Sequence, residues 1–222
     1  MQKKKSDTRT VAVCAMLCAM AFALTAVSHF ILPPLLPAAS WLKYDPKDVV
    51  LAIGALLLGP APAIGISVVS ALLEMLTFSE TGWIGLVMNV VSSCAFILPG
   101  AFLYRRRRTL RTAVGGLLTG TLLMTGMMLL WNAFLTPIYM GMPRDAVIGM
   151  LVPVFLPFNL IKGGLNAAIT LLLYKPLTKA LRSARLLPQS AEAGKGTTKT
   201  AILLALLITA VCTAVLLILN NM

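Results

Sequence analysis

The sequence carries little charge and, in particular, few acidic residues. Asp and Glu contribute only seven of the 222 residues, against nineteen Lys and Arg, and charged residues make up 12% of the chain. A water-soluble domain carries about 25% charged residues, so this composition excludes an ordinary soluble protein. The hydrophobic fraction of 59% instead favours a protein that lies largely in lipid.

The chain also lacks the motifs of common enzymes. A single histidine cannot form a His-rich metal site, and the four cysteines include no Cys-x-x-Cys pair. No G-x-x-x-x-G-K-[ST] loop is present to hold nucleotide phosphates, because Gly194-Lys195-Gly196-Thr197 lacks the required spacing. We therefore expect no enzyme activity, no ATP hydrolysis, no metal site and no cofactor.

What the chain does contain is a series of long apolar segments. The hydrocarbon core of a bilayer is roughly 30 Å thick and needs about 20 mostly apolar residues per helix. Six apolar segments, the second of them short, precede a polar linker, and an uncharged seventh segment follows it. Pro153 and Pro157 predict a kink in the sixth segment. The expected helices cover residues 11–32, 49–58, 63–76, 83–104, 112–139, 146–174 and 201–219.

These segments predict an all-α integral membrane protein, with a six-helix transmembrane bundle and an additional seventh, C-terminal transmembrane helix. We expect a short N-terminus at residues 1–10 and a six-helix membrane domain at residues 11–176. A basic, flexible linker at residues 177–199 would then connect this domain to the C-terminal helix at residues 200–222.

The distribution of Lys and Arg predicts the orientation of the bundle. Fifteen of the nineteen basic residues lie before the first helix, between the fourth and fifth helices, or between the sixth and seventh. If the chain crosses as predicted, these three regions share one side, and an excess of Lys and Arg marks the cytoplasmic side. We therefore expect a cytoplasmic N-terminus. The net charge of +12 is then explained by contact with anionic lipid and not by nucleic acid.

One basic residue, Lys162, falls inside the sixth span. A Lys at the centre of a transmembrane helix costs about 2.5–3.5 kcal/mol on insertion scales, so it should face a cavity, a ligand or an acidic partner. Asn159 and Asn166 lie three residues before it and four residues after it, which places all three on one helical face. The alternatives are that Lys162 extends to the membrane interface or pairs with Glu74 for stability.

Other polar and aromatic residues gather toward the side opposite the basic loops. Tyr44 belongs to a loop with charges of both signs, Glu74 is near the end of the third helix, and Trp131 precedes Asn132 on the fifth. These residues are further candidates for a ligand site. The Gly163-Gly164 step allows another backbone to approach closely.

Small residues form a stripe on the first helix, where Ala15, Ala19 and Ala23 recur every four residues. Such a stripe lets another helix pack closely. It would serve either as packing inside the bundle or as a docking surface for another membrane protein.

Three segments together resemble the riboflavin-specific substrate-binding subunits of energy-coupling-factor (ECF) vitamin transporters. The likeness extends in order over residues 11–176. The segments are Tyr44-Asp45-Pro46-Lys47-Asp48, then Leu130-Trp131-Asn132 with Thr136-Pro137-Ile138-Tyr139-Met140-Gly141, and Pro157-Phe158-Asn159-Leu160-Ile161-Lys162-Gly163-Gly164-Leu165-Asn166.

The resemblance implies a bacterial plasma-membrane protein that binds riboflavin from outside. It also implies partnership with a transmembrane coupling subunit and two cytoplasmic ATPases, so that ATP is hydrolysed elsewhere. In such proteins Asn132, Asn159 and Lys162 would contact the flavin, and Ala15 and Ala19 would face the coupling subunit. Tyr44 or Trp131 would stack on or cap the ring, and Glu74 would accept hydrogen bonds from the ribityl hydroxyls.

Two alternatives remain open at this point. The same architecture could bind another vitamin or precursor, or the chain could be a membrane scaffolding protein without a ligand. The seventh helix departs from the family, whose members end after the sixth. It would be either a lipid-facing addition or an accessory contact to the coupling subunit.

Overall fold

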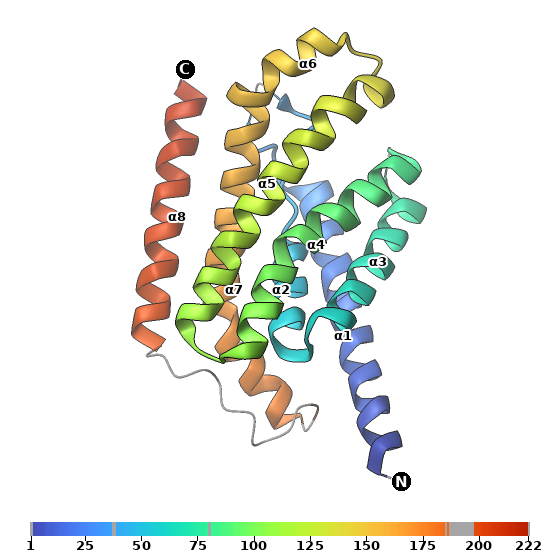
Figure 1. The fold of residues 1–222 in the computed structure, drawn as a ribbon, viewed down its shortest axis with the longest axis vertical. Coiled ribbons are helices and arrows are strands. Elements are labelled where there is room, and N and C mark those ends of the chain that lie inside the picture. Colours follow the sequence, from blue (N-terminus) through green and yellow to red (C-terminus); the bar gives the residue numbers. More distant parts are fainter. Residues whose placement is uncertain (1, 37–38, 80, 185, 187–197, 222) are drawn as a thin grey trace.

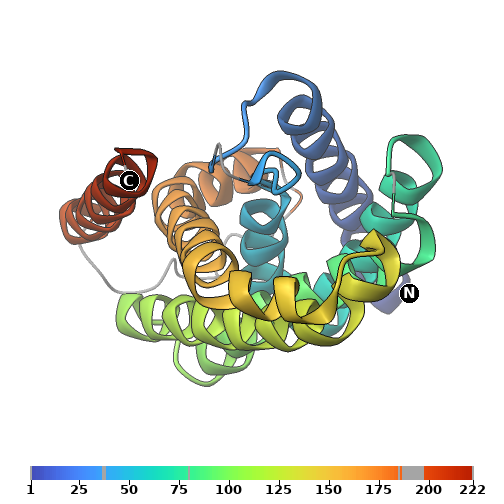
Figure 2. The ribbon, with the colours of Figure 1, turned by 90° about the horizontal axis from the view of Figure 1, so that it is seen from above.

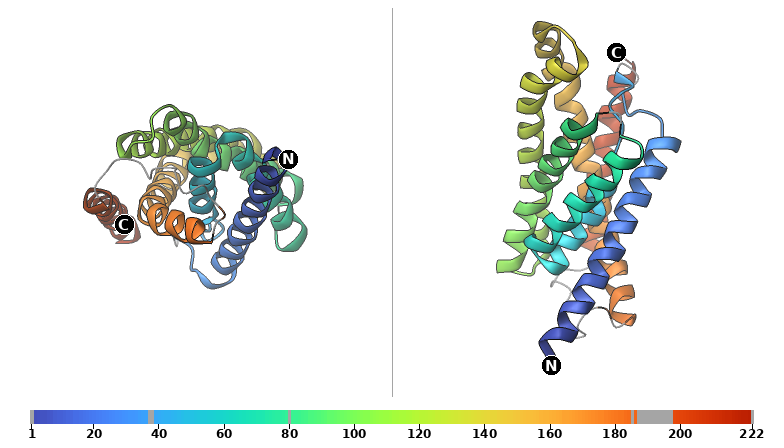
Figure 3. Two further views of the ribbon diagram at one scale, coloured as in Figure 1. Left: turned by 90° about the horizontal axis from the view of Figure 1, so that it is seen from below. Right: turned by 90° about the vertical axis from the view of Figure 1, so that its right-hand side faces the viewer.

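The structure is a computed structural model, and it describes residues 2–36, 39–79, 81–184, 186 and 198–221, most of which are helical. Figure 1 shows a bundle of long helices with the N- and C-termini at opposite ends, and the right-hand view of Figure 3 agrees. In chain order the helices are α1 (Gln2–Ile31), α2 (Lys47–Leu58), α3 (Pro60–Thr77), α4 (Gly82–Arg106), α5 (Leu110–Met140), α6 (Arg144–Met150), the π-helix η2 (Leu151–Phe155), α7 (Leu156–Ser183) and α8 (Thr198–Asn221).

The predicted all-α membrane architecture is confirmed, including the additional C-terminal helix. Six helical segments within the described residues are long and apolar enough to cross a membrane, and α6, η2 and α7 together form one of them. The prediction of seven full spans is wrong for α2. Its twelve residues measure only about 18 Å at a rise of about 1.5 Å per residue, which is little more than half of the bilayer core.

This short helix occupies the centre of the bundle, where the other helices surround it in the view of Figure 2. Between α1 and α2 the structure describes residues 32–36 and 39–46, which we call the α1–α2 loop. Its second part runs down into the bundle before α2 begins (Figure 1). Every residue from Lys47 to Leu56 is buried. The fold therefore places a polar loop and a helix N-terminus at a depth where a full-length span would present only apolar side chains.

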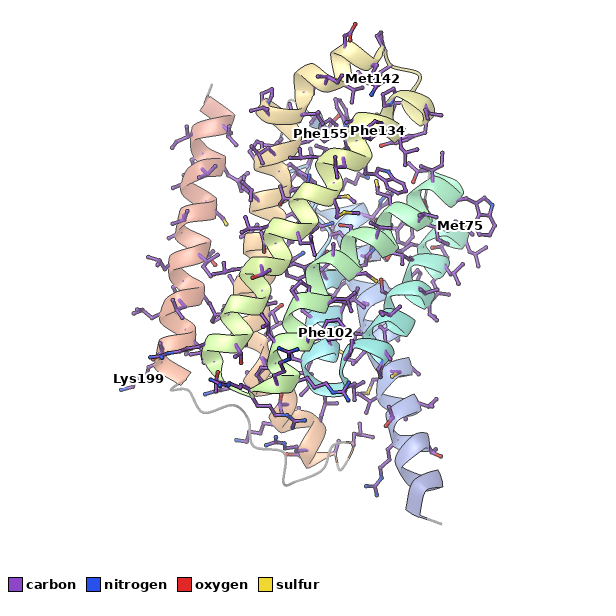
Figure 4. All side chains as sticks on the ribbon, viewed as in Figure 1. Met75, Phe102, Phe134, Met142, Phe155 and Lys199 are labelled. Carbon is purple, nitrogen blue, oxygen red and sulfur yellow. The ribbon has the colours of Figure 1, made fainter. Side chains whose placement is uncertain are left out.

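Three groups of basic residues lie at the same end of the bundle as the N-terminus, and we call this end the basic end. The C-terminal end of α4, the turn into α5, the C-terminal part of α7 and the start of α8 all reach it (Figure 1), and Figure 4 labels Lys199 there. The shared side predicted for these groups is thus reproduced by the bundle. The described members are Arg9, Arg105, Arg106, Arg107, Arg108, Arg111, Lys175, Lys179, Arg182 and Lys199.

Helices α4 and α5 form a tight antiparallel hairpin because glycine leaves room between their backbones. A Cβ atom at Gly116 would lie 2.4 Å from the Cα of Gly100, and one at Gly120 would lie 2.0 Å from the carbonyl oxygen of Phe96. Thr109 caps the start of α5 through a reciprocal pair of hydrogen bonds with Thr112. This hairpin fixes the position of the α5 residues that the sequence assigns to the site.

The sixth predicted helix is interrupted where the prolines indicated. A π-helical turn at Leu151–Phe155 separates α6 from α7, and Pro153 lies within it. Prolines and π-helical turns are common causes of kinks because each disrupts the regular hydrogen bonds of an α-helix. The predicted kink is confirmed, and it sets the direction in which α7 enters the bundle.

The helical structure continues further toward the C-terminus than expected. Helix α7 extends to Ser183, beyond the residue 177 at which the flexible linker was predicted to begin. The rest of that predicted linker, at residue 185 and residues 187–197, lies outside the described residues. Helix α8 then runs along one flank of the bundle, beside α7 and away from α1 (Figure 2).

Candidate functional site

The centre of the candidate site is a buried cluster of charged residues at the start of α2. Lys47 is only 1% exposed, and its Nζ atom lies 2.8 and 2.7 Å from the two carboxylate oxygens of Glu74 on α3. The same Nζ atom forms an ion pair of 2.9 Å with Asp45 in the α1–α2 loop. Lys47, which belongs to the segment from Tyr44 to Asp48 that carries part of the family resemblance, thus lies inside the bundle and not in water. Burying an ammonium group is tolerated here because two carboxylates surround it.

Asp48 forms the second half of this charged cluster. It is completely buried, and Ser93 Oγ on α4 donates a 2.5 Å hydrogen bond to its Oδ1 atom. The Oδ2 atom lies 3.7 Å from Lys162 Nζ on α7 and has no hydrogen-bond partner. Because a hydrogen bond between nitrogen and oxygen is about 2.7–3.2 Å long, this ion pair leaves both charged groups with unused hydrogen-bonding capacity.

The acidic partner of Lys162 is therefore Asp48 and not Glu74. The cluster contains three carboxylates and two ammonium groups, and Asn89 Nδ2 donates to Glu74 Oε2 at 2.9 Å. The Lys162 side chain is 11% exposed. That of Asp45 is 15% exposed, but its carboxylate is engaged by Lys47 and Thr25. Lys162 is thus the member of the cluster best placed to exchange its partner for a ligand.

The α1–α2 loop is tied to α7 and to α1 by hydrogen bonds. Tyr44 OH donates to Asn166 Oδ1 at 2.7 Å, and Asn166 Nδ2 donates to the carbonyl oxygen of Asp45 at 3.2 Å. On the other side, Thr25 Oγ1 donates to Asp45 Oδ1 at 3.0 Å, and Ser28 Oγ donates to the carbonyl oxygen of Tyr44. Burial raises the pKa of the Tyr44 hydroxyl, so the group stays protonated and able to donate.

The remaining predicted residues approach the site without joining this network. Asn159 on α7 is buried, and its amide donates to the carbonyl oxygen of Phe155 at 2.8 Å. Within the described residues, the hydrogen bonds of Asn132 stay on α5, to Met128 and Thr136. The indole Nε1 atom of Trp131 is buried without a hydrogen-bond partner.

The alanine stripe of α1 faces outward. Ala15, Ala19 and Ala23 are exposed, whereas Val13 and Leu17 on the opposite face belong to the core. Of the two interpretations left open by the sequence, packing within the bundle is therefore excluded for these three alanines. They form a flat surface open to lipid or to another protein.

Sequence reasoning missed seven participants in the buried network. Six are polar residues beside or within apolar segments, and the seventh is Lys47; the six are Thr25, Ser28, Asp45, Asp48, Asn89 and Ser93. The signal for Asp45, Lys47 and Asp48 was the pairing of opposite charges in the segment from Tyr44 to Asp48, followed at once by an apolar helix. The same pattern is typical of a loop exposed to water. Only the path of this loop into the bundle shows that its charges are buried.

The fold and the buried polar site are those of a helical membrane protein that binds a ligand. It matches the family described as ECF transporter, substrate-specific component, over residues 9–174, and it belongs to that family. Helix α8 lies beyond the matched residues.

Several characterised relatives in this family are riboflavin transporters. The chain is 29% identical to the riboflavin transporter RibU of Streptococcus thermophilus, over 79% of this chain and 86% of the relative. It is 31% identical to RibU of Staphylococcus aureus over 76% and 89%, and 29% identical to FmnP of Bacillus subtilis over 80% and 98%.

A solved structure shares the fold. It is described as the structure and mechanism of the S component of a bacterial ECF transporter, and it is 30% identical to this chain with a TM-score of 0.65. The similarity covers 99% of that chain but 79% of this one. The shared fold therefore accounts for about four fifths of this chain.

Proposed function

We propose that this protein is the riboflavin-binding subunit of an ECF-type importer. It would capture riboflavin at the end of the bundle opposite the basic end and deliver it to the cytoplasm together with a coupling subunit and two ATPases. The observation that carries the proposal is Lys162, an intramembrane cation with an incompletely satisfied partner, in a chain similar to known riboflavin transporters over most of its length.

The chemistry of riboflavin suits this arrangement. Its isoalloxazine ring is a flat, largely apolar body with carbonyl and imide groups along one edge, and such ligands bind in apolar sites with a few placed polar groups. Lys162 would donate to a ring carbonyl while staying close to Asp48, which balances its charge. Asn159 and Asn132 would supply further donors and acceptors, and Trp131 would offer its free indole N–H or its ring face.

Three of the predicted ligand residues would instead hold the α1–α2 loop in place, because their polar groups already have protein partners. They are Tyr44, Asn166 and Glu74. Tyr44 and Asn166 bond to each other and would close the α1–α2 loop over the ligand. Both oxygens of Glu74 are engaged by Lys47, which favours a role in anchoring the loop over the ribityl contact expected from the sequence. We therefore propose Lys162, Asn159 and Asn132 as the principal ligand residues.

The orientation follows from the same proposal. The basic end, with the N-terminus, would face the cytoplasm of a bacterial cell, as the excess of Lys and Arg indicates. The α1–α2 loop would then open to the outside, and the C-terminal end of α8 would lie on that outer side.

The decisive experiment is the spectrum of the purified protein. Protein prepared from cells grown with riboflavin should be yellow and release flavin on denaturation, and the emptied protein should bind added riboflavin in a calorimetric titration. A folded preparation that binds no riboflavin would overturn the proposal. If another vitamin binds and riboflavin does not, the substrate is a different one. If Lys162→Ala and Asn132→Ala impair folding without a separate loss of binding, the chain is a scaffolding protein.

The alanine stripe provides a second prediction, which concerns the coupling subunit. Changing Ala15 and Ala19 together to Leu should reduce riboflavin uptake by cells at least tenfold, because bulky side chains prevent the close approach of another helix. Riboflavin binding by the purified protein should change less than twofold.

The chain offers a matched control for this variant. Ala210 and Ala214 are exposed on α8 with the same four-residue spacing, so their replacement by Leu adds the same bulk to a different flank. This control should leave uptake unchanged. Equal loss of binding and uptake in the α1 variant would contradict the docking role.

A further inference from the structure

Helix α8 packs against α7 and against a cluster that includes residues of the α1–α2 loop, although it lies beyond the residues that match the family. One of its faces packs against the bundle, while the opposite face is exposed along its length. The inward face is formed by residues at helical spacing, namely Ala201, Ala205, Ile208, Cys212, Leu216 and Leu219.

Gly164 sets the distance between α7 and α8. A Cβ atom at this position would lie 2.7 Å from Cys212 Sγ, so a larger side chain that forms no covalent bond to this sulfur would force Cys212 or α8 to shift. The preceding residue, Gly163, plays the same part toward α5, where a Cβ atom would lie 2.6 Å from Cγ2 of Thr121. The two glycines therefore let two helices approach α7 at the turn that carries Lys162.

A second contact joins α8 to the α1–α2 loop. Leu216 and Leu219, near the C-terminal end of α8, pack against a small apolar cluster that includes Leu36, Ala39 and Phe158. Two members of this cluster belong to the α1–α2 loop, and the third lies at the start of α7. Helix α8 thus packs on the cluster in which the loop meets the start of α7.

The position of α8 also limits what else it can contact. It lies on the flank of α7, whereas α1 with its outward alanine stripe lies across the bundle (Figure 2). A partner seated on that stripe is therefore on the far side from α8. The large residues on the outer face of α8, among them Leu203, Leu207 and Leu217, are suited to lipid.

We propose that α8 is a brace that holds the α1–α2 loop closed against α7 and thereby slows the release of the ligand. This rests on the proposed function, in which the ligand is riboflavin. Ligand exit requires the loop to leave α7, which breaks the bonds from Asn166 to Tyr44 and to Asp45. The loop position seen in the structure places Leu36 and Ala39 in the cluster on which α8 packs, and contacts made in one state alone stabilise that state.

The test removes the loop contacts of α8 in the full-length protein. The double variant Leu216→Ala/Leu219→Ala should release riboflavin about 5–30-fold faster than the unaltered protein, as followed by flavin fluorescence after dilution. The control Leu217→Ala/Ile218→Ala makes the same change at neighbouring positions that are 63% and 61% exposed. Its release rate should stay within twofold of the unaltered protein, and equal rates for both double variants would overturn the proposal.

A readout without ligand separates this proposal from the proposed function. Hydrogen exchange at residues 39–46 should be faster in Leu216→Ala/Leu219→Ala than in the control, even if the protein binds no riboflavin. Equal hydrogen exchange at residues 39–46 in the two double variants would overturn the proposed role of α8. It would not bear on whether the protein binds riboflavin.

A cross-link tests the seat of α8 directly. Gly164→Cys should form a disulfide with Cys212 within one chain when oxidised with copper phenanthroline, because the spacing is close to that of a disulfide. Gly164→Cys/Cys212→Ser should form no such bond. Failure of the cross-link, or faster release of riboflavin from the cross-linked protein, would contradict the proposal.

Discussion

Replacement of Lys162 by Met is expected to lower the affinity for riboflavin by about 10–150-fold, which corresponds to the loss of one hydrogen bond from a charged donor. The ammonium group of Lys162 is the least engaged cation of the buried cluster, since its partner Asp48 lies 3.7 Å away. Met keeps the length of the side chain but removes the charge. Calorimetric titration of the purified variant with riboflavin measures the effect.

Loss of Lys162 also leaves Asp48 without a counter-ion, so a folding defect must be separated from a binding defect. The double variant Asp48→Asn/Lys162→Met has no unpaired charge and should recover the thermal stability that Lys162→Met loses. It should not recover riboflavin affinity. Lys179→Met, an exposed position on the same helix, controls for loss of one charge and should bind as the unaltered protein does. Full affinity in Lys162→Met would remove this residue from the ligand site.

Replacement of Lys47 by Met should instead destabilise the whole bundle, by about 3–5 kcal/mol, because removal of one member of a buried ion pair leaves uncompensated charge. The carboxylates of Asp45 and Glu74 would both lose their cation. The midpoint of unfolding in detergent and the yield of folded protein measure this effect. We expect the Lys47 variant to be recovered poorly or to unfold far below the unaltered protein.

Two comparisons make this prediction specific. Lys43→Met removes a charge from an exposed position of the same loop and should cost little stability. Combining Lys47→Met with Asp45→Asn and Glu74→Gln should be less destabilising than Lys47→Met alone, since no buried carboxylate then lacks a partner. A single Lys47 variant as stable as Lys43→Met would mean that the ion pairs do not hold the loop.

The different outcomes expected for Lys47 and Lys162 show what a sequence can predict about a membrane protein. Lys162 stands inside a long apolar segment, so hydropathy alone identifies it as unusual and demands a partner or a ligand. Lys47 stands at the border of a short segment, where a Lys is ordinary. Its partner Glu74 is 27 residues away, and nothing in the sequence pairs the two.

The helices themselves were predictable because each apolar segment has to satisfy its backbone hydrogen bonds inside the membrane. The C-terminal end of α7 could not be predicted in this way, because hydropathy marks where the membrane ends and not where the helix ends. Lys175, Lys179 and Arg182 are polar but compatible with helix, and α7 continues through them to Ser183. Hydropathy alone could not give the outward direction of the alanine stripe, since α1 is apolar on all sides within the membrane. Only the family resemblance, which implies that Ala15 and Ala19 face the coupling subunit, favoured it.

The shortness of α2 has a consequence for how the protein enters the membrane during synthesis. A segment of twelve residues preceded by Asp45, Lys47 and Asp48 is a poor substrate for insertion on its own, because it does not reach across the bilayer and carries charges at its leading edge. Glu74 on α3 and Lys162 on α7 neutralise those charges only after both helices have been made. We therefore expect α2 to reach its final depth late, drawn in by helices synthesised after it.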